Sequence, residues 1–223
     1  MDPTNIIQTI LIFALPVLFA ITGSSAAQAY AARYFGDYSA QMAGKLTLNP
    51  LKHIDPIGTI LVPLLLYFAT SGGFMFGYGK ATPINYSNMR NPKRDMIWVS
   101  LSGPMANFLQ AILWALMFVM LDGMGINERF FVSMAKAGVM VNLVMWAFNL
   151  FPMPPMAGGL ILMGLLPWKQ SQWLARIAPY GFFIMMGLFF LGVASTYWIQ
   201  PLMSIGYSII NVLMVPFRTL FLG

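Results

Sequence analysis

Residues 22–37 read Thr-Gly-Ser-Ser-Ala-Ala-Gln-Ala-Tyr-Ala-Ala-Arg-Tyr-Phe-Gly-Asp and form the polar end of a long apolar segment. That segment, residues 5–32, predicts a helix of roughly 42 Å, longer than the roughly 30 Å hydrocarbon core of a bilayer. Ser24 and Gln28 are four residues apart, so they lie on one face of this helix. Polar groups inside a membrane helix need partners or a function, so this face is the first candidate site.

The composition identifies the class of protein. Of the 223 residues, 59% are hydrophobic and 8% are charged, whereas soluble domains carry about a quarter charged residues. We therefore expect an all-α polytopic membrane protein with a single domain over residues 1–223, in contact with membrane lipid. The net charge of +6 comes mostly from short loops between apolar runs, which is typical of cytoplasmic loops and not of a nucleic-acid-binding protein.

Two residue types limit the chemistry. Cysteine is absent, and His53 is the one histidine of the chain. These counts exclude a thiolate site and a zinc site built from several histidines of one chain. The N-terminal apolar segment has no basic region before it and no small-residue cleavage site, so we expect a retained membrane helix and not a signal peptide.

The remaining apolar runs predict a bundle of five to six membrane segments. Residues 56–79 are apolar but contain seven glycine and proline residues. Such a segment is typical of a re-entrant stretch that protein or water covers. Full spans are expected at residues 5–32, 96–121, 131–151, 177–199 and 201–217.

The basic loops constrain the topology. Loops 33–55 and 80–95 are both basic, so both favour the cytoplasm, and residues 56–79 must then enter and leave on that side. With this topology the 122–129 loop lies outside, and the 169–176 loop and Arg218 lie inside. If residues 56–79 cross the membrane instead, the later basic loops fall outside, so the re-entrant topology is favoured.

Five motifs in a fixed order carry a family resemblance. They occupy residues 29–37, 46–59, 91–95, 102–107 and 149–159. In this order and spacing the chain resembles the site-2 protease family of intramembrane zinc metalloproteases, in its short bacterial-type form. The resemblance extends over about residues 10 to 195 and implies a site-2 protease-like bundle in a bacterial cell membrane.

The resemblance also assigns the positions of the zinc site. In that family an H-E-x-x-H motif supplies two zinc ligands and the general base, and an aspartate after the proline-rich turn supplies the third ligand. In this sequence Ser24 and Gln28 stand at the histidine positions, Ser25 at the glutamate position and Ala157 at the aspartate position. We therefore expect no zinc and no ordinary peptidase activity. The chain is either a natural inactive homologue or a deliberately changed sequence.

Two asparagines are candidates for polar roles near this site. Asn149 ends a span before the proline-rich turn. The resemblance suggests that it faces the active-site cavity and holds a substrate backbone, while the alternative is that it satisfies carbonyls freed by the turn. Asn107 is expected to pack between helices and to satisfy backbone groups.

His53 and Asp55 are further substrate-binding candidates. His53 is either a loop histidine paired with Asp55 or a backbone carbonyl, or a pH sensor. The two residues could also activate Ser24 or Ser25 as a nucleophile. The alternative is that the polar residues of the first helix hydrogen-bond between helices, where small residues allow close approach.

Three functions follow from these observations. The favoured one is a non-catalytic homologue that holds a transmembrane or extended peptide segment of a single-span membrane protein, with the peptide along strand edges in the 38–60 or 80–90 loops. The alternative is an active intramembrane peptidase with an unrecognised site. A small transporter is less favoured, because it needs ionisable residues along a membrane path and the spans contain only Lys136.

Overall fold

The computed structural model describes residues 3–55, 58, 61, 65 and 79–222, and the elements assigned in these ranges are helical. Within these described ranges, five helices are long and apolar enough to cross a membrane, which confirms the all-α polytopic membrane fold. The elements are α1 Pro3–Phe35, α2 Ser39–Met42, η1 Pro50–Lys52, η3 Tyr86–Asn88, α4 Pro92–Gly123, α5 Arg129–Asn149, α6 Ala157–Leu165, α7 Trp168–Phe190, η4 Ser195–Ile199 and α8 Gln200–Leu222.

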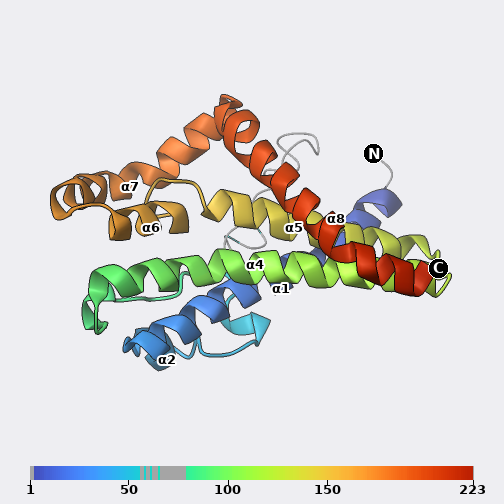
Figure 1. Ribbon diagram of the computed structural model, residues 1–223, viewed down its shortest axis with the longest axis horizontal. Coiled ribbons are helices and arrows are strands. Elements are labelled where there is room, and N and C mark those ends of the chain that lie inside the picture. Colours follow the sequence, from blue (N-terminus) through green and yellow to red (C-terminus); the bar gives the residue numbers. More distant parts are fainter. Residues whose placement is uncertain (1–2, 56–57, 59–60, 62–64, 66–78, 223) are drawn as a thin grey trace.

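Helix α4 is the centre of the bundle. It runs the length of the molecule in Figure 1 and packs against α1, α5, α6 and α8. Glycines allow the helices to approach closely. The indole of Trp114 lies where a Cβ of Gly138 would be, and the side chain of Ile97 lies where a Cβ of Gly164 would be. Small residues at helix contacts are the usual means of packing membrane helices, because lipid provides little hydrophobic driving force between them.

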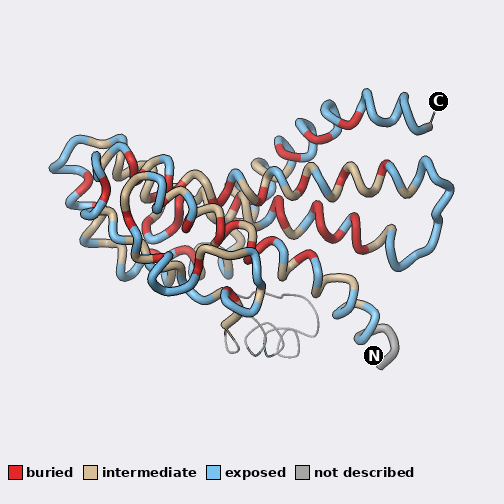
Figure 2. Tube along the Cα trace, turned by 90° about the horizontal axis from the view of Figure 1, so that it is seen from below, coloured by how far each residue is buried: buried red, intermediate tan, exposed pale blue. Residues whose placement is uncertain are grey.

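The buried residues form stripes on the facing sides of the helices, as Figure 2 shows. One apolar cluster joins α4, α5 and α8 and includes Val119, Leu143 and Met214. A second joins the end of α5 to the α7–α8 region, where the indole nitrogen of Trp198 donates to the Ala147 carbonyl (3.0 Å). Many large apolar side chains on the outer faces are exposed, as expected for surfaces that contact lipid.

Helix α7 differs from the predicted span at residues 177–199. It covers Trp168–Phe190, nine residues earlier at each end. The helix stops just before Gly192, whose φ of 76° is a left-handed conformation that favours glycine. A π-helical turn, Ser195–Ile199, then leads into α8. The predicted bounds were too late because hydropathy excluded the basic residues of the first turns of α7.

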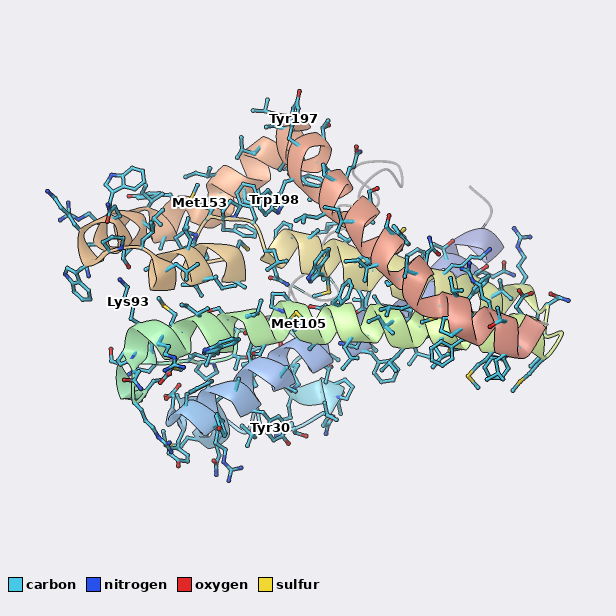
Figure 3. The ribbon with its side chains drawn as sticks, in the orientation of Figure 1. Tyr30, Lys93, Met105, Met153, Tyr197 and Trp198 are labelled. Carbon is cyan, nitrogen blue, oxygen red and sulfur yellow. The ribbon has the colours of Figure 1, made fainter. Side chains whose placement is uncertain are left out.

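Basic residues from three segments of the chain lie together at one end of the bundle. At one end the Arg90 amide donates to the Phe35 carbonyl (3.2 Å), and the Lys93 ammonium donates to the Leu166 carbonyl (Figure 3). This basic end, residues 33–37, 88–94 and 166–176, confirms that the predicted inner loops lie together. That it faces the cytoplasm stays a prediction.

The placement of Arg218 on that side was wrong. Phe221 packs against Gly123, at the far end of α4, so the end of α8 lies beside the 122–129 loop. Helices α7 and α8 meet at an angle and together run once along the molecule (Figure 1). The sequence was interpreted as two full crossings, which would have returned Arg218 to the basic end.

The segment predicted to be re-entrant, residues 56–79, lies almost entirely outside the described residues. Its flanks are described and they meet: the Lys80 amide donates to the His53 carbonyl (2.8 Å). The residues on either side of this segment therefore lie next to each other, as the predicted re-entrant topology requires.

Candidate functional site

The polar face of α1 lies against a glycine of α4. A Cβ on Gly103 would collide with the amide of Gln28 and would lie 3.0 Å from Ser24 Oγ. Ser24 is buried, and Ser25 and Gln28 are half-buried. Among the described residues the side chains of these three make no hydrogen bond. Close packing on Gly103 therefore positions Ser24 and Gln28, and the interhelical hydrogen bonds considered from the sequence are not found there.

One turn deeper, two asparagines connect three helices. The Asn107 amide donates to the Ala20 carbonyl of α1 (3.1 Å) and to Asn142 Oδ1 of α5 (3.1 Å). Asn142 in turn donates to the Gly138 carbonyl (2.9 Å), and both asparagines are fully buried. This network confirms the packing and backbone-satisfying role expected of Asn107. It sets the register of α1, α4 and α5 beside Ser24.

A groove of about 300 Å³ lies between α1 and α4 on the side of the 38–55 loop. Two buried polar atoms in its lining, Thr22 Oγ1 and Gln110 Nε2, have no hydrogen-bond partner among the described residues. Gln110 rests directly on Gly23, so the glycine provides the space for the amide. The remaining lining is mostly apolar and consists of Phe19, Leu48, Ala106, Leu109 and Leu113. The groove thus combines apolar walls with unused hydrogen-bonding capacity.

The loop beside this groove is held by buried polar side chains. Lys45 Nζ donates to the carbonyls of Lys52 (2.6 Å) and Lys80 (3.2 Å). The His53 ring nitrogen Nε2 donates to the Thr47 carbonyl (2.8 Å). Tyr30, which extends from α1 in Figure 3, donates its hydroxyl to the same loop. The loop is therefore tied both to residue 80 and to α1.

Burial determines the charge states in this loop. It lowers the pKa of His53; the Thr47 carbonyl opposes that effect, and the Lys45 charge adds to it. Burial and the charge of Lys80 likewise lower the pKa of Lys45, against the attraction of Asp55. His53 is thus a neutral, structural histidine near neutral pH.

The structure does not assemble a serine–histidine–aspartate relay from the described residues. His53 uses Nε2 for Thr47, and its Nδ1 has no partner among the described residues, so it is not bonded to Asp55. Asp55 Oδ1 accepts from the Gly58 amide (3.0 Å). The backbone-carbonyl alternative for His53 is confirmed, and its pairing with Asp55 is not.

Asp37 fastens the end of α1 to the 80–90 loop. It accepts hydrogen bonds from the Ser39 hydroxyl (2.6 Å), the Asn88 amide (3.1 Å) and the Asn85 backbone N–H (2.8 Å). Burial alone would raise the pKa of Asp37, but these bonds together hold it below its ordinary value. The described parts of both loops contain short helical turns and no strands, so the strand edges expected there for peptide addition are not present among these residues.

The proline-rich turn after Asn149 is tightly packed. The carbonyl of Leu150 lies where a Cβ of Gly158 would be, and the carbonyl of Pro154 lies in the same way on Gly181. Asn149 is half-buried, and its side chain makes no hydrogen bond among the described residues. The alternative in which it caps the carbonyls of the turn therefore has no support here, and its substrate-binding role stays a prediction.

The residues at the assigned ligand positions do not fit a zinc ion. Ser24 and Gln28 provide a hydroxyl and an amide packed on Gly103, and Ala157, which begins α6 and is 6% exposed, provides a methyl group. Within the described ranges no three His, Cys, Asp or Glu side chains come together, whereas a catalytic zinc takes three such ligands.

Two groove residues, Thr22 and Gln110, were not among the predicted site residues. Gln110 places a side-chain amide in the middle of the apolar span at residues 96–121. Because polar groups in membrane helices need partners, the sequence could have identified it as a candidate site residue. Thr22 opens the polar end of α1 but carries no motif. The role of Gly23 and Gly103 in seating two glutamine side chains depends on helix pairing and has no local signature.

Comparison with known proteins adds an independent observation. The chain is 30% identical over 201 residues, 86% of this chain and 85% of the relative, to YwhC of Bacillus subtilis strain 168, which is named as a candidate zinc metalloprotease. Rip2 of Mycolicibacterium smegmatis, named in the same way, is 35% identical over 85 residues, 38% of this chain and 31% of that protein. No protein-family model and no solved structure matches the chain.

Proposed function

Since the chain belongs to the site-2 protease family of membrane zinc metalloproteases, we propose that it is a non-catalytic member that binds transmembrane or extended peptide segments of a membrane protein. Both relatives come from bacteria, which supports a bacterial cell membrane as its location. The positive-inside rule supports a cytoplasmic position for its basic end.

The donor chemistry at the four family positions carries this proposal. Hydrolysis in a zinc peptidase needs a metal-bound water and a carboxylate base. Ser24 and Gln28 provide neutral oxygens, Ala157 provides no donor, and Ser25 has no carboxylate. No step of metal-assisted hydrolysis can be assigned to these residues, whereas the helices that surround them remain packed.

The α1–α4 groove is the proposed binding site. Its apolar side chains suit a membrane peptide, and Thr22 Oγ1 and Gln110 Nε2 can bond peptide backbone. A regular helix already satisfies its own N–H and C=O groups. An unwound or extended stretch of the peptide is therefore the form that would use these two groups.

A restoration experiment tests the loss of chemistry. The purified protein is expected to contain no stoichiometric zinc by elemental analysis. The variant Ser24→His/Ser25→Glu/Gln28→His/Ala157→Asp is expected to bind zinc and to cleave a single-span substrate. The matched control keeps Ser25 and carries the other three changes, so that it binds zinc without cleavage. Stoichiometric zinc in the unmodified protein would sink the proposal.

A binding experiment tests the groove. A fluorescent single-span peptide is titrated into nanodiscs that carry the protein. Gln110→Leu is expected to weaken binding roughly fivefold to tenfold, as the loss of about one hydrogen bond does. Gln172→Leu is the matched control, because Gln172 is exposed on α7. Equal affinities for the two variants would show that the peptide binds elsewhere.

A further inference from the structure

A second groove lies where α8 crosses α4 and α5, near the end of the bundle opposite the basic end (Figure 1). Its volume is about 330 Å³, within the roughly 300–1,000 Å³ of small-ligand sites. Residues of the buried core, among them Val119 and Met214, form its floor. Lys136, Tyr207 and Arg218 bring polar groups to its lining.

The two basic side chains of this groove carry charge that the described residues do not neutralise. Lys136 Nζ lies 5.2 Å from the centroid of the Phe118 ring, and Arg218 Nη2 donates to Asn211 Oδ1 (3.2 Å). The groove lining contains no carboxylate. Neither cation forms an ion pair with a described residue. Ionisable groups at membrane depth usually have a partner or a function, so an anion is the missing complement.

The carboxylates of this end do not fill that role. Asp122 is exposed in the last turn of α4, Glu128 is exposed just before α5, and neither lines the groove. Gly123, next to Asp122, packs against Phe221 of α8. Among the described residues, neither carboxylate therefore neutralises Lys136 or Arg218.

The depth of the two cations matches a lipid headgroup. Lys136 lies seven residues after Arg129, at about 10 Å along α5, and Arg218 lies four residues before Leu222, at about 6 Å along α8. Helix α4, with 32 residues, is about 46 Å long, so its ends pass beyond a hydrocarbon core of roughly 30 Å. Long basic side chains at such depths extend to the interface, where lipid phosphates lie.

We propose that this groove binds an anionic phospholipid, with Lys136 and Arg218 on the phosphate. The hydroxyl of Tyr207 and the amide of Asn211 are in place to bond the remaining headgroup oxygens. The acyl chains lie along the flank of the groove on α5, where Met140 and Val144 are exposed one and two turns after Lys136. That apolar continuation distinguishes a lipid from a water-soluble anion. The site is separate from the proposed peptide groove and does not depend on it.

The test measures binding of phosphatidylglycerol to the full-length protein. The protein in phosphatidylcholine nanodiscs is titrated with phosphatidylglycerol, and the thermal unfolding temperature and the retained lipid by native mass spectrometry are recorded. Wild type is expected to retain phosphatidylglycerol and to be stabilised by it. Lys136→Gln/Arg218→Gln is expected to bind it roughly tenfold or more weakly.

Lys169→Gln/Arg176→Gln is the matched control, because it removes two exposed basic charges from α7 at the opposite end. It is expected to bind phosphatidylglycerol as wild type does. Equal losses in the two double variants would overturn the proposal in favour of general charge attraction. Inorganic phosphate alone is expected to have no effect, and full stabilisation by it would overturn the lipid assignment. If the first double variant fails to fold, Lys136→Arg/Arg218→Lys, which keeps both charges, must retain the lipid.

Discussion

The side-chain amide of Gln28 lies directly over the Cα of Gly103, so that any Cβ at residue 103 would overlap it. The family resemblance predicts that Gln28 stands at the position of a zinc-binding histidine, and Gly103 belongs to the motif at residues 102–107. The contact shows that α4 packs directly on the polar face of α1. The free energy of packing at this point therefore depends on the size of both side chains.

Gly103→Ala is expected to destabilise the protein by about 1–3 kcal/mol, because the added methyl overpacks a closed helix contact. Thermal unfolding in detergent micelles measures this. The control is Gly187→Ala in α7, where a Cβ would meet nothing within 4 Å. The control should be neutral or slightly stabilising, because alanine favours helix over glycine by about 0.5–1 kcal/mol.

The double variant Gly103→Ala/Gln28→Ala separates overpacking from other effects. Removing the long amide should recover most of the lost stability, because the two groups occupy the same space. If the double variant is as unstable as Gly103→Ala alone, the contact between Gln28 and Gly103 does not determine the packing of α1 on α4.

Asn107→Leu is expected to cost about 1–3 kcal/mol. It removes the donor to the Ala20 carbonyl and leaves Asn142 Oδ1 without its partner in a buried site. Asn127→Leu is the matched control, since Asn127 is exposed in the 122–129 loop. Unfolding of the two variants in the same micelles should differ by at least 1 kcal/mol. Equal stabilities would contradict the hydrogen-bond network.

The stability of the 45–55 loop is expected to fall with pH below about 6.5. Burial lowers the pKa of His53 below its ordinary 6.5, so the opened loop binds a proton at a higher pH than the folded loop. The contribution of neutral His53 is therefore complete above that pH and is lost as the pH falls toward the folded-state value. Hydrogen exchange of the Lys80 amide, which donates to the His53 carbonyl, reports this opening.

His53→Gln provides the control for that titration. Its side-chain amide can still donate to the Thr47 carbonyl, but it does not titrate. After correction for intrinsic exchange, the loop opening measured at the Lys80 amide should then depend much less on pH between about pH 7.5 and 5. Asp37, with a pKa below its ordinary 3.8, remains charged in this range. The same pH profile in His53→Gln and wild type would rule out His53 as the cause.

Lys93→Met is expected to loosen the α6–α7 turn, because the ammonium of Lys93 donates to the Leu166 carbonyl. Hydrogen bonds to charged groups contribute about 1.5–3 kcal/mol. Faster hydrogen exchange across residues 166–171 would record the change. Arg94→Met removes the same charge from an exposed neighbour and should leave exchange in the turn unaltered. If both variants loosen the turn equally, the effect comes from the charge and not from the bond.

Much of the fold could be predicted from the sequence. The spans expected at 5–32, 96–121 and 131–151 correspond to α1, α4 and α5, within four residues at each end. Long apolar runs can satisfy their backbone in a bilayer only as helices, so composition and length suffice to identify them. The α7 bounds were missed because the exposed basic residues Lys169 and Arg176 placed the first turns of this helix outside the predicted apolar run.

The candidate site was only partly predictable. Ser24, Ser25, Gln28 and Ala157 were predicted because flanking motifs mark their positions, and their assignment as the family's zinc-site positions stays a prediction. Thr22 and Gln110 were missed, since what distinguishes them is the groove that forms when α1 meets α4. The basic groove was missed for the same reason: Lys136 and Arg218 are far apart in the chain, and Arg218 was expected at the other end.

From the amino-acid sequence alone followed a membrane protein of long helices and the prediction that its zinc-site positions lack metal-binding donors. Both properties are local, because hydropathy and donor chemistry belong to each residue and its near neighbours. Only the tertiary structure decided that Gln28 rests on Gly103, that Asn107 joins three helices, and that Arg218 shares a groove with Lys136. Those relationships depend on which helix faces meet, and helix pairing in lipid is set by shape and by a few hydrogen bonds between distant residues.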